Sequence, residues 1–138
     1  MPASDRKPRV LLAVSPRAAG RMRHVLEGWE IAQLDSLSAL AHELRCTSYD
    51  LVVVGHLFDG SRAIEAVKTA LLHARHVPLV CVRAAPFQTA LGEAAICAFQ
   101  AAAEELGAEC FIDVLQFSDD RHGNARVRGI LERLAFVA

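Results

Sequence analysis

Five short runs of β-forming residues recur along the chain, and a segment with helical spacing follows each of them. Residues 10–14 and 51–54 are continuously apolar, which is typical of strands buried on both faces. Residues 79–82 and 110–112 form two further runs, and the more polar run 30–34 is expected at a sheet edge. This alternation predicts an α/β fold in which helices cover both faces of a five-stranded parallel sheet, as a three-layer αβα sandwich.

The segments between the runs carry apolar residues with the i, i+3, i+4, i+7 spacing of an amphipathic helix. Leu37 and Leu44 bound one such stripe, and Ser36 directly before it is a suitable N-cap. The last stripe runs from Val127 to Leu134. The sequence His122-Gly123-Asn124 is typical of a helix break, so we expect this last helix to begin near Asn124.

The fourth crossover, residues 84–108, is unusual because ten of its 25 residues are alanine. Gly107 stands where a helix is expected to end, so the segment predicts a helix of four or five turns. Two apolar rows run along it, and one row is enough to cover the sheet. The other reflects either the helix propensity of alanine or a face that packs on a second subunit. The candidate interface residues are Leu91, Ala95, Ala98, Phe99 and Ala102.

Length and charge limit the classes of function. With 138 residues, of which 53% are hydrophobic, the chain is expected to form a single domain over residues 1–138, with residues 1–8 flexible. The net charge is −1, so no overall field attracts nucleic acid or an anionic membrane. Basic residues are frequent in the first 23 positions, but no nucleic-acid motif accompanies them. We therefore expect neither nucleic acid nor a membrane as a partner.

The four cysteines lie far apart among apolar neighbours, and none forms a Cys-x-x-Cys pair: Cys46, Cys81, Cys97 and Cys110. This pattern favours small buried thiols in a reducing compartment. The apolar run 10–14 is too short for a signal peptide or a membrane span. A cytoplasmic protein is the expectation.

Candidate catalytic and metal-binding residues are sparse. His73 and His76 lie three residues apart, but the helix is expected to break before Pro78 and no third ligand is near in sequence. Ser15 lacks a Gly-x-Ser-x-Gly turn. We therefore predict no metal site, no cofactor and no enzymatic activity.

Local strings along nearly the whole chain resemble the receiver domain of bacterial two-component response regulators, CheY-like in type. Residues 9–15 resemble the first strand with its acidic end, and residues 49–55 resemble the third strand that leads to the phosphoacceptor. Residues 78–84 resemble the fourth strand, and residues 106–112 resemble the segment before the fifth. The resemblance implies a flavodoxin-like fold with strand order 2-1-3-4-5.

The residues that receivers use for phosphorylation are missing from this pattern. A receiver needs a nucleophilic carboxylate, two carboxylates for Mg²⁺, a hydroxyl and a lysine. The nucleophile position falls on Gly55, the acidic pair on Val14 and Ser15, and the hydroxyl on Arg83. The lysine position falls on Val114 or, with a slip of one residue, on Asp113. The resemblance thus predicts a degenerate pseudo-receiver that is not phosphorylated.

The fourth crossover is also longer than in the resembling receivers, by roughly two and a half helical turns. The enlarged apolar helix lies where the family makes dimer and output contacts. We therefore expect a phosphorylation-independent signalling or regulatory module that acts through protein–protein interaction and forms a homodimer.

A different class of function remains open: a sensor or enzyme for a small anion or nucleotide-type ligand. In open α/β sheets, ligands bind beyond the carboxyl ends of the strands. His56 and Arg83 are expected there and could bind an anion. The alternative is that Arg83 pairs with Asp113 or Asp59 and fills the space of the missing metal site.

Overall fold

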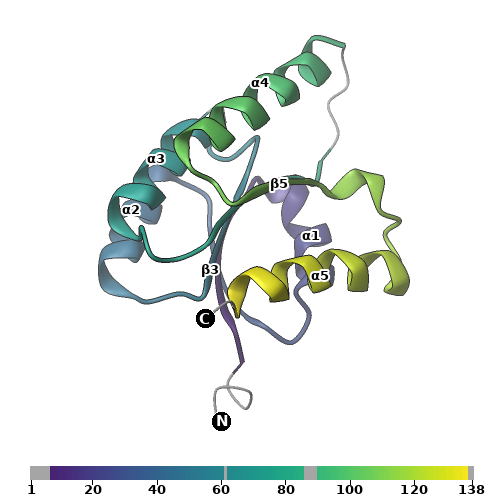
Figure 1. Cartoon of the computed structure of the whole chain (residues 1–138), viewed down its shortest axis with the longest axis horizontal. Helices are drawn as coiled ribbons and strands as arrows, with labels where there is room; N and C mark the ends of the chain where they lie inside the picture. The colour runs from purple at the N-terminus through teal and green to yellow at the C-terminus, as the bar shows by residue number, and fades with distance from the viewer. Residues whose placement is uncertain (1–6, 61, 86–89, 137–138) are drawn as a thin grey trace.

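A computed structural model describes residues 7–60, 62–85 and 90–136 (Figure 1). All five strands are parallel and pair in the order β2-β1-β3-β4-β5. The polar strand β2 lies at an edge, as the sequence predicts. The strand bounds are β1 Arg9–Ala13, β2 Glu30–Leu34, β3 Leu51–Gly55, β4 Leu79–Arg83 and β5 Cys110–Asp113.

Helices cover both faces of the sheet, with α1 and α5 on one side and α2, α3 and α4 on the other (Figure 1). Their bounds are α1 Pro16–Val25, α2 Leu37–Cys46, α3 Ala63–His73, α4 Ala90–Leu106 and α5 Arg121–Ala135, and a short 3-10 helix, η2 Val114–Gln116, precedes α5. The predicted fold class is therefore confirmed: a flavodoxin-like three-layer sandwich.

Two hydrophobic cores flank the sheet because successive strand residues point to opposite faces. Val10 and Leu12 of β1 pack under α1 and α5, whereas Leu11 and Ala13 pack under the other three helices. The central strand β3 is buried along its whole length. The sheet is therefore shielded on both faces, and only its two outer strands, β2 and β5, lie near solvent.

Helix α4 has 17 residues, or about 4.7 turns, in agreement with the predicted length. It is followed by Gly107 in a left-handed conformation with φ 116°, which favours glycine. The inclusion of Phe99 among the interface residues is wrong. Its side chain is only 8% exposed and packs edge to face on Phe111, with ring centroids 6.0 Å apart, so it belongs to the core.

Helix α5 begins at Arg121, three residues before the predicted start. The N-cap is Asp120, whose carboxylate accepts the N–H of Gly123 at 2.7 Å. This cap satisfies an amide that the helix itself leaves without a partner. Gly123 and Asn124 are therefore buried parts of the first turn and do not break the helix.

The cysteines are less uniformly buried than the sequence suggests. Cys81 is buried, and its burial raises the pKa of the thiol to about 12. Cys110 is half-buried, whereas Cys46 and Cys97 are exposed on α2 and α4. The prediction of buried thiols is thus wrong for these two, because each falls on the outer face of its helix.

Two further expectations concern the chain as a whole. The predicted flexible segment 1–8 falls mostly outside the described residues, although the carbonyl of Pro8 accepts the N–H of Glu30 at 2.9 Å. In the described ranges, none of the helices combines the length and the apolar character that crossing a bilayer requires.

Candidate functional site

The candidate residues lie at or just after the last residues of strands β1, β3, β4 and β5. Because the strands are parallel, these residues gather at one end of the sheet, which we call the carboxyl edge. Ser15 follows β1 and is the N-cap of α1. Gly55 ends β3, Arg83 ends β4 and Asp113 ends β5. Val114 opens the 3-10 helix and is fully buried. This carboxyl edge is the place where open α/β sheets bind ligands.

Val14 fills the space next to Gly55. A Cβ placed on Gly55 would lie 3.0 Å from Cγ1 and 3.2 Å from Cβ of Val14, closer than carbon atoms normally approach. Val14 is itself fully buried. The position predicted to correspond to the phosphoacceptor therefore has no side chain, and an apolar group packs directly against its backbone.

Arg83 and Asp113 form an ion pair at the carboxyl edge, on strands β4 and β5. Their Cα atoms are register partners on β4 and β5. The guanidinium donates from Nε to Oδ1 at 3.1 Å and from Nη2 to Oδ2 at 2.5 Å. The two side chains are only 12% and 16% exposed. A two-contact pair of this kind is directional and is strengthened by its partial burial.

The sequence left open that Arg83 pairs with Asp113 or with Asp59 and does not bind an external anion. The structure shows the pair with Asp113. Asp59 has a different role. It adopts a left-handed φ of 48° and accepts the N–H of Leu37 at 2.9 Å, at the start of α2. Asp59 thereby caps a helix on the opposite side of β3 from Arg83.

Ser15 and His56 complete the carboxyl edge. The Oγ of Ser15 is buried and has no hydrogen-bond partner among the described residues, although the residue is the N-cap of α1. The half-buried His56 follows β3 directly, and its backbone N–H donates to the carbonyl of Val82 at 3.2 Å. The sequence thus places His56 and Arg83 correctly at one edge of the sheet.

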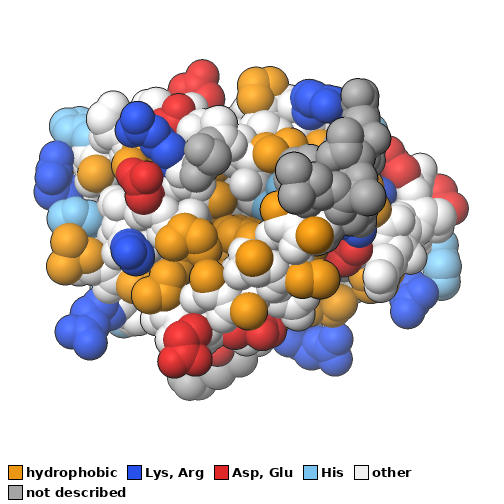
Figure 2. Space-filling view, turned by 90° about the horizontal axis from the view of Figure 1, so that it is seen from above, with side chains coloured by type: hydrophobic (Ala, Val, Ile, Leu, Met, Phe, Trp, Pro, Cys, Tyr) orange, Lys and Arg blue, Asp and Glu red, His pale blue; other side chains and the backbone are white. Residues whose placement is uncertain are grey.

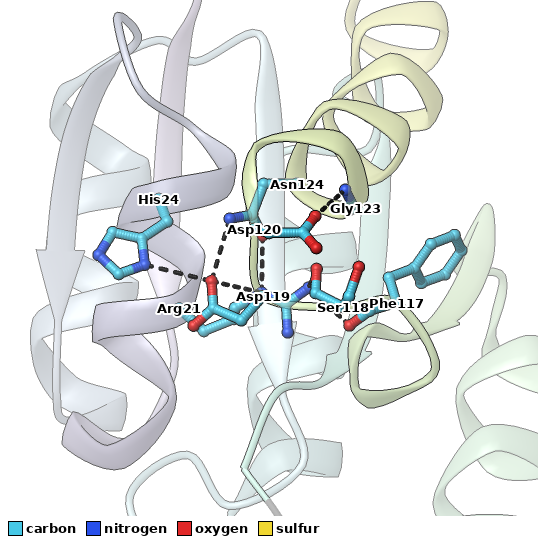
Figure 3. A network of polar contacts seen from close by, with 8 residues as sticks. All are labelled: Arg21, His24, Phe117, Ser118, Asp119, Asp120, Gly123 and Asn124. Atoms are coloured by element: carbon cyan, nitrogen blue, oxygen red, sulfur yellow. Dashed lines mark hydrogen bonds and ion pairs between the residues drawn. The ribbon is translucent and has the colours of Figure 1, made fainter.

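A second polar cluster joins α1 to α5, the two helices that cover one face of the sheet (Figure 3). Arg21 lies at its centre: Nε donates to Oδ1 of Asn124 at 2.7 Å, and Nη2 donates to the carbonyls of Phe117 and Ser118 at 2.9 and 3.1 Å. The side chain of Arg21 is only 9% exposed. Arg21 is therefore a structural link between α1 and the start of α5, although it belongs to the basic N-terminal part of the sequence.

Asp119 extends this cluster toward solvent. Its Oδ1 accepts Nδ2 of Asn124 at 3.0 Å and lies 3.4 Å from Nδ1 of His24 (Figure 3). These hydrogen bonds, with that from Asn124 the strongest, hold the pKa of Asp119 below its usual value. A buried arginine that faces a Gly-Asn pair more than 100 positions later leaves no local signal, so sequence reasoning missed it.

The paired histidines lie apart from both clusters. His73 ends α3, and His76 lines a hollow of about 430 Å³ at the amino ends of the strands, with Asp50 and Glu109. Across the described part of the chain, His, Cys, Asp and Glu side chains form no group of three or more that could hold a metal ion.

The candidate interface residues on α4 do not share one environment. Ala95 and Ala98 are exposed, and Ala102 is half-buried. Leu91 lies in the first turn of the helix, and its side chain is outside the described part of the structure. Together with the buried Phe99, this leaves an exposed alanine face that is narrower than the predicted one.

Solved structures supply the comparison with known proteins. The receiver domain of the sensor histidine kinase PA1611 from Pseudomonas aeruginosa PAO1, which carries a magnesium ion in its active-site cleft, matches with a TM-score of 0.69 and 14% identity over 96% of this chain and 100% of that chain. The phosphorylated cyanobacterial phytochrome response regulator RcpA matches with 0.67 and 15% over 96% and 97%. The orphan response regulator HP1043 of H. pylori matches with 0.61 and 21% over 92% and 96%.

At the level of sequence, no protein-family model and no curated protein matches the chain. The likeness to solved structures nevertheless extends over nearly its whole length. The chain therefore has the fold of response-regulator receiver domains.

Proposed function

We propose that this protein is a phosphorylation-independent, receiver-like regulatory module that acts by protein–protein contact. The proposal has two parts. One concerns the carboxyl edge of the sheet, which would not take part in phosphoryl transfer. The other concerns the outer surface of the helices, which would carry the function through binding.

The single observation that carries the first part is the contact of Val14 with Gly55. Phosphoryl transfer to a protein needs a nucleophile and charges that stabilise the transferred group. Glycine offers no nucleophilic side chain, and a Cβ at this position would lie only 3.0 Å from Cγ1 of the apolar Val14. Hard cations such as Mg²⁺ take oxygen ligands, and an isopropyl group supplies none.

The ion pair of Arg83 with Asp113 supports the same conclusion. Asp113 is the carboxylate at the end of β5, and it already accepts two hydrogen bonds from Arg83. A Mg²⁺ ion placed beside it would have to compete with a guanidinium held at 2.5 Å. Such competition is unfavourable, because separating the pair leaves a poorly solvated cation behind.

The alternative function, an anion or nucleotide-type ligand bound by His56 and Arg83, gains no comparable support. The guanidinium of Arg83 is matched by a carboxylate of opposite charge on the neighbouring strand. An incoming anion would therefore have to displace Asp113 before it could form the same two contacts.

Thermal unfolding tests the proposal against this alternative. The protein is heated with Mg²⁺ alone, with Mg²⁺ plus beryllofluoride as a phosphoryl mimic, and with inorganic phosphate. A ligand present at 100 times its Kd stabilises a protein by about 2.7 kcal/mol. We expect no rise of the melting temperature in any of the three conditions.

Two outcomes would contradict the proposal in different ways. A rise with Mg²⁺ and beryllofluoride would show a working phosphorylation site. A rise with inorganic phosphate that is lost in Arg83→Met, each variant being compared with its own unliganded melting temperature, would favour the anion-binding function.

A further inference from the structure

The groove between α3 and α4 exposes hydrophobic side chains. Leu72 on α3 is 73% exposed, which is the highest value among the large hydrophobic residues that the structure describes. Leu106 at the end of α4 is 38% exposed. Both line a hollow of about 380 Å³ together with Lys68, Leu71 and Arg75. A single exposed leucine is ordinary, but exposed apolar side chains that form a continuous patch are typical of a surface that another protein covers.

The outer face of α4 continues this apolar surface. Ala94, Ala98 and Ala101 are exposed along it. Figure 2, which looks onto the side of the molecule that carries α4, shows hydrophobic side chains gathered over the middle of this face with charged side chains around them. Side chains as small as alanine allow a second helix to approach closely.

Charges of opposite sign border the two halves of the surface. Lys68 lies one turn before Leu72 on α3, and Arg75 lies just beyond the helix end. On α4, Glu105 lies four residues after Ala101 and is exposed, as is the neighbouring Glu104. Within the described residues, none of these four charged side chains takes part in an ion pair or hydrogen bond. At the carboxyl ends of the two helices, the α3 side is thus basic and the α4 side is acidic.

The two helices run in the same direction, because each connects two strands of a parallel sheet. Their carboxyl ends meet at the shared hollow, where Leu72 and Leu106 both lie. A two-fold axis along the groove would therefore place α3 of one copy on α4 of the other, with the carboxyl ends together. Lys68 and Arg75 would then face the second copy's acidic end, as the self-complementarity of a two-fold interface requires.

We propose that a second copy of this chain covers the α3–α4 surface, in a two-fold homodimer with Leu72 packed on the last turn of the second copy's α4, next to its exposed alanines. This inference rests on the proposed function, since it names the partner of the protein–protein contact. It assigns the contact to α3 and α4 and leaves β5 and α5 outside it.

The mass of the protein in solution tests the pairing. Light scattering after gel filtration at high micromolar concentration should give twice the mass of the chain. Leu72→Glu should weaken the dimer by roughly tenfold or more, because it buries a charge in the apolar part of the interface. Leu115→Glu is the matched control: Leu115 is a 37% exposed leucine on η2, outside the proposed surface, and its change should leave the dimer intact.

Charge reversal tests the two-fold arrangement itself. Changing Lys68 and Arg75 to Glu should weaken the dimer, and changing Glu104 and Glu105 to Lys should do the same. Combining all four reversals restores opposite charges across the axis and should recover most of the affinity. Circular dichroism of each variant confirms that it is folded.

Two results would overturn the inference. They are a monomeric wild type at high micromolar concentration, and a dimer that Leu72→Glu leaves intact, whether or not Leu115→Glu disrupts it. Each of these can occur whether or not the carboxyl edge accepts a phosphoryl group, so the dimer and the phosphorylation independence stand or fall by separate measurements.

Discussion

Arg83 and Asp113 are opposite each other in the register of β4 and β5, and their side chains form a two-contact ion pair across the carboxyl edge of the sheet. The pair joins an edge strand to the interior of the sheet at a point where both side chains are largely withdrawn from water. Its removal is therefore expected to affect stability, and the size of the effect depends on which partner is left behind.

The single variants Arg83→Met and Asp113→Leu should each lower the free energy of unfolding by about 1–3 kcal/mol, because each leaves a poorly solvated charge without its partner. The double variant should be closer to the wild type than either single variant. Urea unfolding of the four proteins measures this cycle. Equal and additive losses would show that the pair contributes no coupling energy.

Gly123 is expected to be indispensable, whereas Gly129 in the same helix is not. A Cβ on Gly123 would lie 1.9 Å from the carbonyl oxygen of Ser118, which is backbone and cannot rotate away. Gly123→Ala should therefore cost ~2 kcal/mol or more. Nothing lies within 4 Å of a Cβ on Gly129, so Gly129→Ala should stabilise by up to ~1 kcal/mol. Chemical unfolding of the two variants checks the contrast, and a similar loss for both would contradict the close packing of α5.

Arg21 is expected to hold α1 to the start of α5. Arg21→Met removes the donors for Asn124 and for two backbone carbonyls, which should cost about 1–3 kcal/mol of unfolding free energy. Arg17→Met is the matched control, because Arg17 is an exposed residue of the same helix, and its change should stay within ~0.5 kcal/mol. If the two variants unfold at the same urea concentration, Arg21 is no more than a solvated side chain.

Acid should weaken the start of α5. The N–H of Gly123, and after it the side chain of Ser118, lower the pKa of Asp120. A carboxyl group whose pKa is lower in the folded state stabilises the fold above its unfolded pKa, and this contribution is lost as the pH falls through the folded pKa. The loss should therefore occur below the ordinary value of 3.8.

Asp120→Asn isolates this effect, because asparagine keeps the N-cap but does not titrate. Urea midpoints between about pH 5 and pH 2.5 should fall less steeply for the variant than for the wild type. Parallel curves for the two proteins would show that Asp120 is not the origin of the acid sensitivity.

Much of the fold follows from patterns that are local in the sequence. Continuous apolar runs such as 51–54 become central strands because both faces of a parallel sheet are covered. Ser36 is the predicted N-cap, and its Oγ accepts the N–H of Ala39 at 3.2 Å. The carboxyl edge was also predictable, because parallel strands end on the same side and the residues after each run must gather there.

The errors at Asn124 and Phe99 share one cause, which is that the partner of the side chain lies far away in the sequence. The Gly123-Asn124 pair is typical of a helix break, yet it lies in the first turn of α5, where Asn124 is held by Arg21, a residue of the first helix. The pattern of α4 places Phe99 on an apolar row, but only the position of Phe111 on β5 decides that this row faces the core. The contact of Val14 with Gly55 likewise depends on the pairing of β1 with β3.

The most direct test of an inactive carboxyl edge is the intact mass of the protein after incubation with acetyl phosphate and Mg²⁺, with a phosphorylatable receiver in the same tube as a control for the reagent. We predict that the control gains the mass of one phosphoryl group and that this protein gains none. An acid-stable or hydroxylamine-sensitive mass increase of one phosphoryl group on this chain would contradict the proposal.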